Sequence, residues 1–359
     1  MFTTSKKPQT VVGLDIESGS VAATEVKTNG SRAVGRTAIA PLHPGIVNEG
    51  EVVDTEALSD ALRSLFAQHK LGKDVRLGVA NQRVVVRTLQ LPLIEDEKEI
   101  DTAVRFRAQD QIPMPLDQAV LDHRVVSRGK SPEGDRQMEV IAVAARRDMV
   151  VSLLAALRKA GLKPVGIDLS AFGMIRALDA GPTPPAEVGG DEDAQIQTTV
   201  LYCYLGDITN LAVARGGQCL FTRVAPFGME SIAQRVAERA EVSLEDARDS
   251  VLDVGLEEPI DSFEGDEHAQ GTRDALEQGA TKLVDELRLS LDFYSAQEGA
   301  ASIERVVLCG PGGSVPGLPE RVQAGLGLGI EVMVPAALRG LDPEDAARLT
   351  VSYGLAIDD

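Results

Sequence analysis

The feature that most constrains the fold of this chain is a pattern that appears twice. An apolar run, a short polar turn and a second apolar run follow one another at residues 11–26, around LDIESGS, and again at residues 198–214, around GDITN. Apolar runs joined by such turns predict pairs of neighbouring strands. The 359 residues are enough for two domains of ordinary size. Because each unit opens one half of the chain, the pattern predicts an α/β protein with two related lobes.

Helix and strand signals alternate after each unit. We expect helices after a cap at Asp54 or Thr55, over 95–111, after a cap at Asp148, and over 171–178, 229–240, 244–251 and 281–295. Strands are expected at 77–80, 84–91, 121–126, 138–145, 165–168, 305–308 and 330–334. Between the halves, residues 181–197 combine Pro, Gly and acidic residues without apolar periodicity, which predicts a linker.

The charge balance narrows the choice of partners. Lys and Arg number 36 against 55 Asp and Glu, a formal charge of −19. Nucleic acids and anionic lipids need a cationic surface, so neither is expected as a partner. The cysteines, Cys203, Cys219 and Cys309, form no CxxC pair, which indicates a reduced cytosolic compartment. No apolar run approaches the ~18 residues of a membrane span, and no basic amphipathic tail is visible, so direct membrane insertion is not expected.

Much of the negative charge lies in one stretch. Residues 241–277 hold 13 acidic residues against Arg248 and Arg273, a balance of −11. Within it, residues 261–270 lack the spacing of a calcium loop, so a solvated flexible loop is expected there. We interpret the stretch as a solvated outer face.

Three turns rich in Gly, Ser and Thr follow predicted strands, at residues 17–20, 206–210 and 310–314. Such turns can present backbone N–H groups to phosphate oxygens, and small residues let the backbone approach them closely. Each of the first two, taken alone, is more typical of a plain hairpin. Their repetition in two halves, followed by a GxGG turn before a helix, favours a nucleotide site between two lobes.

Several longer segments resemble a known family. They include VVGLDIESGSVAATEV, RFRAQDQIPMPLDQAVLDHRVV, AARRDMVVSLLAALRKAGLKPVGIDL and VVLCGPGGSVPGL. On these segments the chain resembles the actin-like ATPase superfamily and, within it, the PilM family of type IV pilus assembly proteins. The QIPMPL and AARRDMV segments are the more diagnostic ones, since all actin-like proteins share phosphate loops.

The resemblance implies an actin-like two-lobed fold, built on ribonuclease H-like repeats, with an FtsA/PilM-type subdomain inserted into the first lobe. Residues 1–81 and 163–180 would form the first lobe and 82–162 the inserted subdomain. Residues 198–235 and 281–359 would form the second lobe, and 236–280 its acidic outer subdomain.

The resemblance also implies a role. A PilM-like protein is a cytoplasmic scaffold that is recruited peripherally to the inner membrane by the cytoplasmic tail of PilN, a single-span membrane protein. The tail would lie in a groove between the first subdomain and residues 82–162. Other pilus platform or ATPase components are further implied partners, and a homo-oligomer stays open. Two alternatives remain: a small-molecule kinase of the same superfamily and an FtsA-like division protein.

The implied ATP and Mg²⁺ site departs from the family pattern. Glu17 replaces a Gly of the first loop, Ala22 replaces its Lys, and Tyr204 replaces an Asp before the second loop. A carboxylate ~5 Å from a phosphate costs on the order of 3 kcal/mol per charge pair at an effective dielectric constant of ~20. ATP binding is therefore expected to be weakened, and hydrolysis is not expected. The loop positions carried over are Asp15, Glu17, Ser18, Gly19, Ser20, Gly206, Asp207, Thr209, Asn210, Gly310, Gly312, Gly313 and Ser314.

Three acids have further implied roles. Asp15 and Asp207 could hold Mg²⁺ through water molecules, with Asp207 partly replacing the acid lost at Tyr204. Asp168, at the end of a predicted strand, is a candidate for orienting a catalytic water. Its alternative role is to cap the helix predicted at 171–178.

Overall fold

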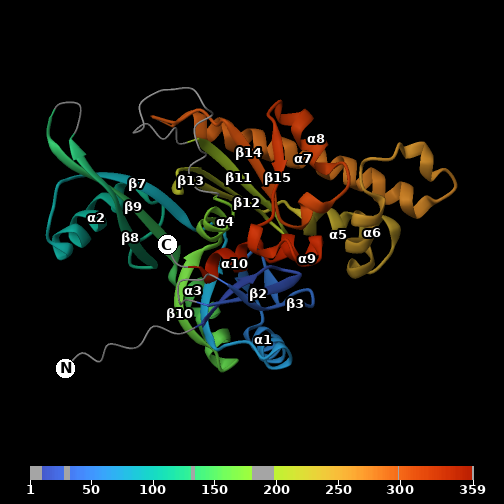
Figure 1. Ribbon diagram of the computed structural model, residues 1–359, viewed down its shortest axis with the longest axis horizontal. Helices are drawn as coiled ribbons and strands as arrows, with labels where there is room; N and C mark the ends of the chain where they lie inside the picture. The colour runs from blue at the N-terminus through green and yellow to red at the C-terminus, as the bar shows by residue number, and fades with distance from the viewer. Residues whose placement is uncertain (1–9, 28–32, 131–133, 180–197, 298, 358–359) are drawn as a thin grey trace.

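The computed structural model describes residues 10–27, 33–130, 134–179, 198–297 and 299–357. Within these residues the strands form two five-stranded sheets, a three-stranded sheet and a two-stranded ladder. The predicted linker 181–197 lies outside the described residues. Figure 1 shows helices α4 and α10 between the two large sheets.

The first large sheet has the strand order β10-β6-β1-β2-β3. Strand β1 pairs antiparallel with β2, and β2 with β3, whereas β6 and β10 continue the sheet in parallel on the other side of β1. The bounds are β1 Thr10–Ile16, β2 Ser20–Lys27, β3 Val34–Pro41, β6 Asp74–Val79 and β10 Lys163–Leu169. Strands β4 Val47–Asn48 and β5 Glu51–Val52 form the ladder.

The second large sheet repeats this plan in the order β13-β12-β11-β14-β15. Strand β11 pairs antiparallel with β12 and parallel with β14. The bounds are β11 Thr199–Leu205, β12 Thr209–Arg215, β13 Gln218–Ala225, β14 Arg305–Cys309 and β15 Ile330–Val332. In both sheets the repeated strand-turn-strand unit supplies the central strand and its hairpin partner, as the sequence predicts.

Helices α4 (Ser170–Leu178) and α10 (Thr350–Ala356) fill the space between the sheets. Met174 and Ile175 of α4 pack against Val200 and Tyr202 of the second sheet, while α10 contacts β1, β2 and β6 of the first. The two helices touch at glycines, since a Cβ added to Gly354 would lie 1.8 Å from the carbonyl oxygen of Gly173. Only glycine therefore fits at this crossing.

The outer face of the first sheet is covered by α1 (Thr55–His69) and α3 (Arg147–Lys159). Helix α1 begins as predicted, because the Asp54 side chain accepts hydrogen bonds from the N–H groups of Glu56 and Ala57. The cap predicted at Asp148 is wrong. Strand β9 runs directly into α3, and Asp148 lies in the first turn, where it pairs with Arg146 and makes no cap bond.

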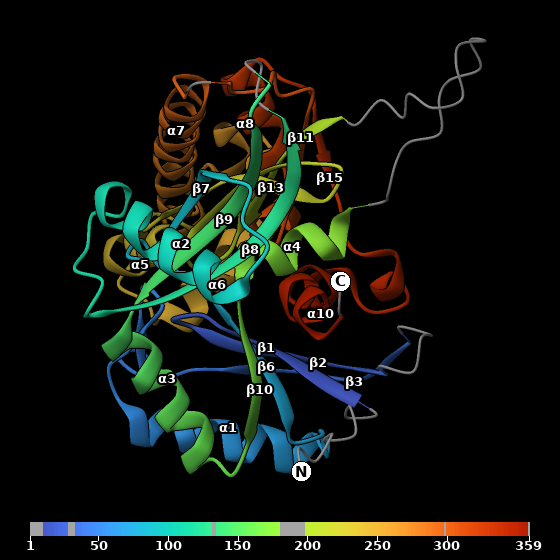
Figure 2. The ribbon, with the colours of Figure 1, turned by 90° about the vertical axis from the view of Figure 1, so that its left-hand side faces the viewer.

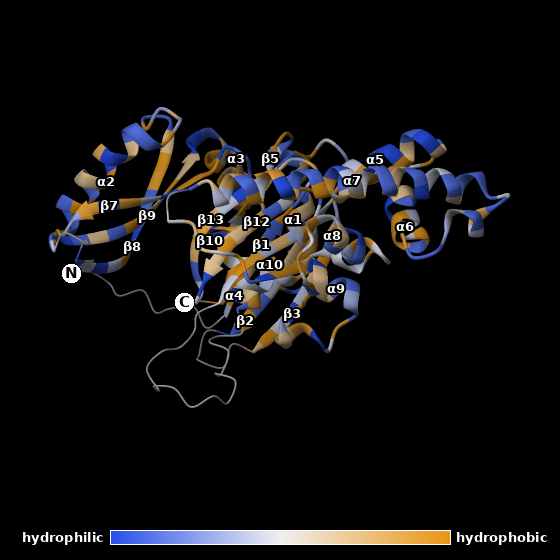
Figure 3. Ribbon diagram, turned by 90° about the horizontal axis from the view of Figure 1, so that it is seen from above, coloured by the Kyte–Doolittle hydropathy of each residue, from blue (hydrophilic) through white to orange (hydrophobic). Residues whose placement is uncertain are grey.

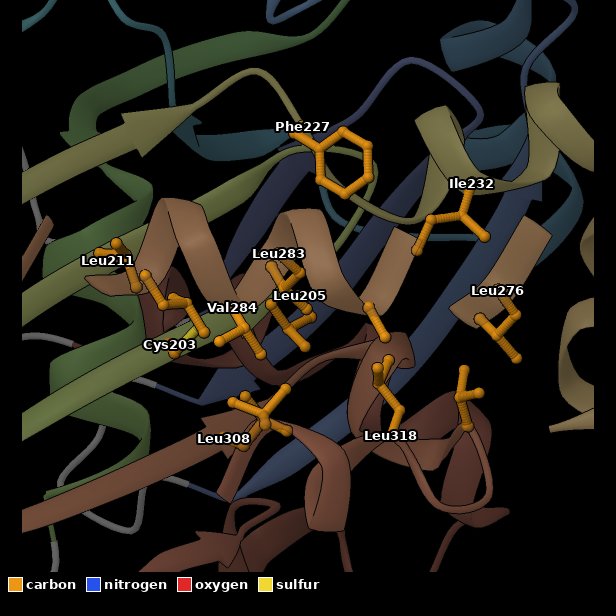
Figure 4. Close-up of a cluster of buried hydrophobic side chains, with 14 of the residues drawn as sticks. Cys203, Leu205, Leu211, Phe227, Ile232, Leu276, Leu283, Val284, Leu308 and Leu318 are labelled. Atoms are coloured by element: carbon orange, nitrogen blue, oxygen red, sulfur yellow. The ribbon is translucent and has the colours of Figure 1, made fainter. Parts of the chain in front are cut away.

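The second sheet packs against α5 (Met229–Ala240), α7 (Glu267–Ser295) and α8 (Leu318–Leu326). Figure 4 shows this core, in which Leu205 and Leu308 from the strands meet Leu283 of α7 and Leu318 of α8. Its side chains are largely aliphatic, consistent with a chain of 3% aromatic residues. The last helices are α9 (Pro343–Arg348) and α10.

The acidic stretch is more ordered than its sequence predicts. Helix α6 covers Leu244–Val254, a 3-10 turn covers Ile260–Phe263, and α7 begins at Glu267, not near 281. The flexible loop expected at 261–270 is therefore wrong in its second half. The Asp266 side chain accepts from the N–H of Ala269 and so caps α7, and Leu276 is buried in the second core.

A small three-stranded sheet with one helix projects at one end of the molecule, opposite α5 and α6 (Figure 3). Its strand order is β7-β9-β8, with bounds β7 Val85–Pro92, β8 Ala119–Lys130 and β9 Arg136–Arg146. Helix α2 (Glu97–Gln111) covers one face with Ile100 and Val104. Figure 2 shows this unit above the first sheet and next to the second.

Packing differs from the predicted domain boundaries at two places. Helix α3, predicted to lie in the inserted subdomain 82–162, buries Leu153 and Leu157 in the core of the first sheet. Helix α10, predicted to lie in the second lobe, packs on β1 and β2 of the first sheet. Each carries an apolar face that the first sheet covers, so position along the chain is a poor guide to the lobe. The other boundaries stay predictions.

Candidate functional site

The turns that follow the two central strands meet between the large sheets. The N–H of Gly19, in the β1–β2 turn, donates to Asp207 Oδ2 at 2.6 Å. In return, the N–H of Asp207, in the β11–β12 turn, donates to Glu17 Oε1 at 2.9 Å. Each turn therefore places a carboxylate on a backbone N–H group of the other.

Glu17 is held inside this contact by further groups. The hydroxyl of Tyr204 donates to Glu17 Oε2 at 3.4 Å. A Cβ added to Gly206 would lie 2.0 Å from Glu17 Oε1, so glycine is needed there for the carboxylate to fit. The residues that depart from the family pattern at positions 17 and 204 thus contact each other.

Burial changes the acid strength of these carboxyl groups. Burial raises the pKa of Asp15 to about 6, although its Oδ1 accepts a hydrogen bond from Ser170 Oγ at 3.1 Å. Burial, followed by the charges of Asp207 and Asp15, raises the pKa of Glu17 well above its usual range. Burial also raises the pKa of Asp207. Crowding of acids in a desolvated space favours their protonated forms.

Two arginines border the same space. Arg248 of α6 makes a two-pronged pair with Glu230, at 3.0 and 2.8 Å, and its Nη2 lies 2.4 Å from the position that a Cβ on Gly19 would take. Arg348 of α9 donates to Glu344 Oε1 at 3.2 and 3.0 Å. Both guanidinium groups are therefore already paired with carboxylates.

The third turn, residues 310–314, packs against Tyr204 and Leu205 at the end of β11. Residues 311–314 form a 3-10 turn, and Gly310 has φ +82°. A Cβ on Gly310 would lie 2.8 Å from the Tyr204 ring, and one on Gly312 would lie 2.5 Å from the Cβ of Leu205. The glycines here allow close packing against the end of β11.

Little free space remains between the turns. A cavity of about 50 Å³ is lined by residues that include Gly19, Ser20, Asp207 and Pro311. A second, of about 20 Å³, is lined by residues that include Asp15, Ser18 and Asn210. Ligand pockets usually measure roughly 300–1,000 Å³. We refer to this region as the cleft.

A larger opening lies between the small sheet and the first sheet. It has a volume of about 280 Å³ and is bordered by strands β8 and β9 on one side and by β10 and α4 on the other. A neighbouring cavity of about 410 Å³ shares four of its lining residues and reaches the β12–β13 turn of the second sheet. We call the two together the groove. The shared residues are Arg124, Ile141, Phe172 and Arg176.

The comparison with known families decides the identity. Residues 13–356 match the family described as type IV pilus assembly protein PilM. The chain belongs to the PilM family. The resemblance drawn from the sequence is therefore confirmed.

Solved structures agree with this assignment. The PilM–PilN type IV pilus biogenesis complex contains a chain with 26% identity and a TM-score of 0.77, covering 96% of this chain and 97% of that one. The ethanolamine utilization protein EutJ from Carboxydothermus hydrogenoformans has 14% identity and a TM-score of 0.56, covering 98% and 90%. MreB5 of Spiroplasma citri bound to ADP has 13% identity and a TM-score of 0.52, covering 96% and 94%. The last two support the fold alone, and the predicted actin-like fold class is confirmed.

Most loop residues carried over from the PilM pattern gather at the cleft. Asp15, Glu17, Ser18, Asp207 and Asn210 line its smaller cavity. Gly19 and Ser20 line its larger one. Gly206, Gly310 and Gly312 pack around Tyr204 and Leu205, with Gly313 and Ser314 in the same 3-10 turn. Thr209 is buried, and its hydroxyl donates to the carbonyl of Phe227 at 2.7 Å.

Asp168 does not join the acids of the cleft. Its carboxylate pairs with Arg176, and both side chains line the groove. It does not cap the following helix either, because α4 begins after Leu169 without a side-chain cap bond. In this PilM-family chain the geometry thus assigns Asp168 to the groove.

Sequence reasoning missed Glu230 and Arg248 at the cleft and Phe172 at the groove. The pair Glu230–Arg248 joins α5 to α6, and no local motif marks such a contact. Among the described residues, no cluster of three or more His, Cys, Asp or Glu side chains is arranged to hold a metal ion. The described helices also include none with the length and hydropathy of a membrane span.

Proposed function

We propose that this PilM-family chain is a cytoplasmic scaffold of the type IV pilus inner-membrane platform, and that it binds the cytoplasmic tail of a PilN-like single-span protein in the groove. The observation that carries the proposal is the groove, because it opens between the first sheet and the small sheet, where the resemblance to PilM implies that the tail lies. The likeness to a chain of the PilM–PilN complex, over 96% of this chain, supports it.

The walls of the groove suit an extended peptide. Strand β10 is an edge of the first sheet and β8 is an edge of the small sheet, and both border the opening. Edge strands carry backbone groups without a ladder partner on one side, and peptides bind proteins by adding a strand there. Alternate side chains of such a peptide would enter the apolar part of the groove.

The lining matches a tail with apolar residues. Val120 on β8 and Ile167 on β10 keep 38% and 41% of their surface exposed, and Phe172 of α4 lies in both cavities. Large apolar side chains left partly open beside a cavity are typical of binding sites. Because the second cavity reaches the β12–β13 turn, a long tail would touch both lobes.

The decisive experiment measures tail binding with a variant in the groove and a matched one outside it. Ile167→Asp places a charge on the edge strand β10. Val332→Asp places the same charge on β15, an edge strand of the second sheet, where Val332 is 48% exposed. We expect calorimetry with the tail of a neighbouring single-span membrane protein to show binding by the wild type and Val332→Asp, and at least about tenfold weaker binding by Ile167→Asp.

Two results would contradict the proposal. One is the absence of binding heat with every candidate tail, which would mean that no such tail is the partner. The other is an equal loss of affinity in both variants, which would mean that the tail does not bind in the groove.

Recruitment by such a tail would place the chain at the inner face of the cytoplasmic membrane. The remaining surfaces are then free for other platform or ATPase components, or for a second copy of the chain.

A further inference from the structure

We propose that the cleft is closed by the chain's own carboxylates and does not take a nucleoside triphosphate. Glu17 and Asp207 occupy the backbone N–H groups through which the two turns would otherwise hold phosphate oxygens. This goes beyond the weakened ATP binding expected from the sequence, and it does not depend on the tail.

A phosphate would have to compete with the carboxylates for the N–H donors of the turns. A turn binds an anion through N–H groups that have no partner in the protein. Here the N–H of Gly19 and the N–H of Asp207 already have carboxylate partners from the opposite turn. A phosphate that displaced them would leave two buried carboxylates without these donors, which is costly in a desolvated space.

The charged residues of the cleft also disfavour a nucleotide. Of the described residues that line the two cavities, Asp15, Glu17, Asp207 and Glu230 are acids, Arg248 and Arg348 are bases, and none is a lysine. Both arginines pair with acids already. The position where the family pattern has its lysine is Ala22, which is buried against α10 in a cluster with Tyr353. A polyanion would therefore meet no unpaired cation among the described lining residues to offset its charge.

The cleft also lacks the space for a nucleotide. The Glu17 carboxylate fills the volume above Gly206, and the Tyr204 ring fills the volume beside Gly310. The cavities left, about 50 and 20 Å³, are much smaller than typical ligand pockets.

One consequence concerns the lobes. In a nucleotide-bound cleft the ligand would link the two turns, whereas here the polypeptide links them directly through two hydrogen bonds between residues 188 and 190 positions apart. The two lobes are then held together by contacts within the chain, without a bound ligand.

The test compares Glu17→Gly with Glu241→Gly. Both changes remove one glutamate side chain, but Glu241 is exposed, ends α5 with φ 53° and lies outside the cleft. Binding of a fluorescent ATP analogue with Mg²⁺ and the shift of Tm with Mg-ATP are measured for each. We expect no saturable binding by the wild type or Glu241→Gly and saturable binding by Glu17→Gly, since removing this side chain frees the N–H of Asp207 and opens the space above Gly206.

Hydrogen exchange provides a second measurement on the wild type alone. The peptides that contain Gly19 and Asp207 should be protected without nucleotide, and Mg-ATP should leave their protection unchanged. Saturable submillimolar binding of Mg-ATP by the wild type, or fast exchange at these two amides, would overturn the proposal. Equal binding by the two glycine variants would show that the Glu17 side chain does not close the site.

Discussion

The cleft and the groove are both bordered by helix α4, yet one is closed and the other open. At the cleft, Ser170 of α4 donates to Asp15 amid paired acids, and cavities of about 50 and 20 Å³ remain. At the groove, Phe172 of the same helix faces cavities of about 280 and 410 Å³. The difference shows that one helix can border two regions of which only the groove keeps a large open volume.

The largest effect on stability is expected at the contact between α10 and α4, because α4 borders both the cleft and the groove. Gly354→Ala would place a Cβ 1.8 Å from the carbonyl oxygen of Gly173, so α10 and α4 must separate. We expect a loss of more than about 3 kcal/mol in the free energy of unfolding, measured with urea. Gly340→Ala, which meets no atom within 4 Å, is the control and should be near neutral. A small loss in Gly354→Ala would mean that α4 adjusts freely, and that the two regions do not share a rigid support.

A smaller effect is expected inside the cleft, from Asp15→Asn. The folded pKa of Asp15 is raised from 3.8 to about 6, with Ser170, Asp207 and Glu17 as its neighbours. An acid with a raised pKa binds its proton more tightly when folded, so its contribution to stability is largest below pH ~4 and is lost as the pH rises through 6. At pH 7.5 we therefore expect Asp15→Asn to be more stable than the wild type by about 2 to 3 kcal/mol.

Denaturation curves between pH 4 and pH 8 check this sign. The gain of Asp15→Asn should vanish near pH 4, while Asp292→Asn, at an exposed aspartate of α7, should follow the wild type throughout. A variant that is destabilised at pH 7.5 would indicate that ionised Asp15 is satisfied in the cleft, and that the cleft is less closed than its geometry indicates.

The smallest effect is expected for Mg-ATP on tail binding, because it would require the cleft to influence the groove. If the cleft takes no nucleotide, Mg-ATP has nothing through which to change tail binding in the groove. Calorimetric titration of the tail with and without Mg-ATP should give the same affinity within about twofold. A larger change would mean that the cleft binds Mg-ATP and that this binding alters the groove.

The sequence predicts the fold and the position of the cleft well, because both depend on local patterns. Strand-turn-strand units and their polar turns are visible within short windows, so the residues around Asp15 and Asp207 could be identified. The departure at Glu17 was also visible. Its partner was not, since the N–H of Asp207 reaches Glu17 only after two sheets meet.

The groove was harder to predict from residues alone. Asp168 stands at the end of a strand, which made it a candidate for orienting a catalytic water, but it pairs with Arg176 and lines the groove. Phe172 lies in a short helix among small residues and carries no motif. The contact of α10 with α4 depends on Gly354, which in the sequence is one glycine of 34.

The reciprocal bonds of Glu17 and Asp207 also limit how the sequence can change. Replacement of Glu17 alone leaves the N–H of Asp207 without its acceptor, and replacement of Asp207 alone does the same to Gly19. Buried donors without partners are costly, so each single step away from this pair passes through a less stable protein. The two positions, 190 residues apart, are therefore coupled, and a change at one is expected to be tolerated better when the other changes with it. To free both turns for a phosphate, both carboxylates would have to be replaced.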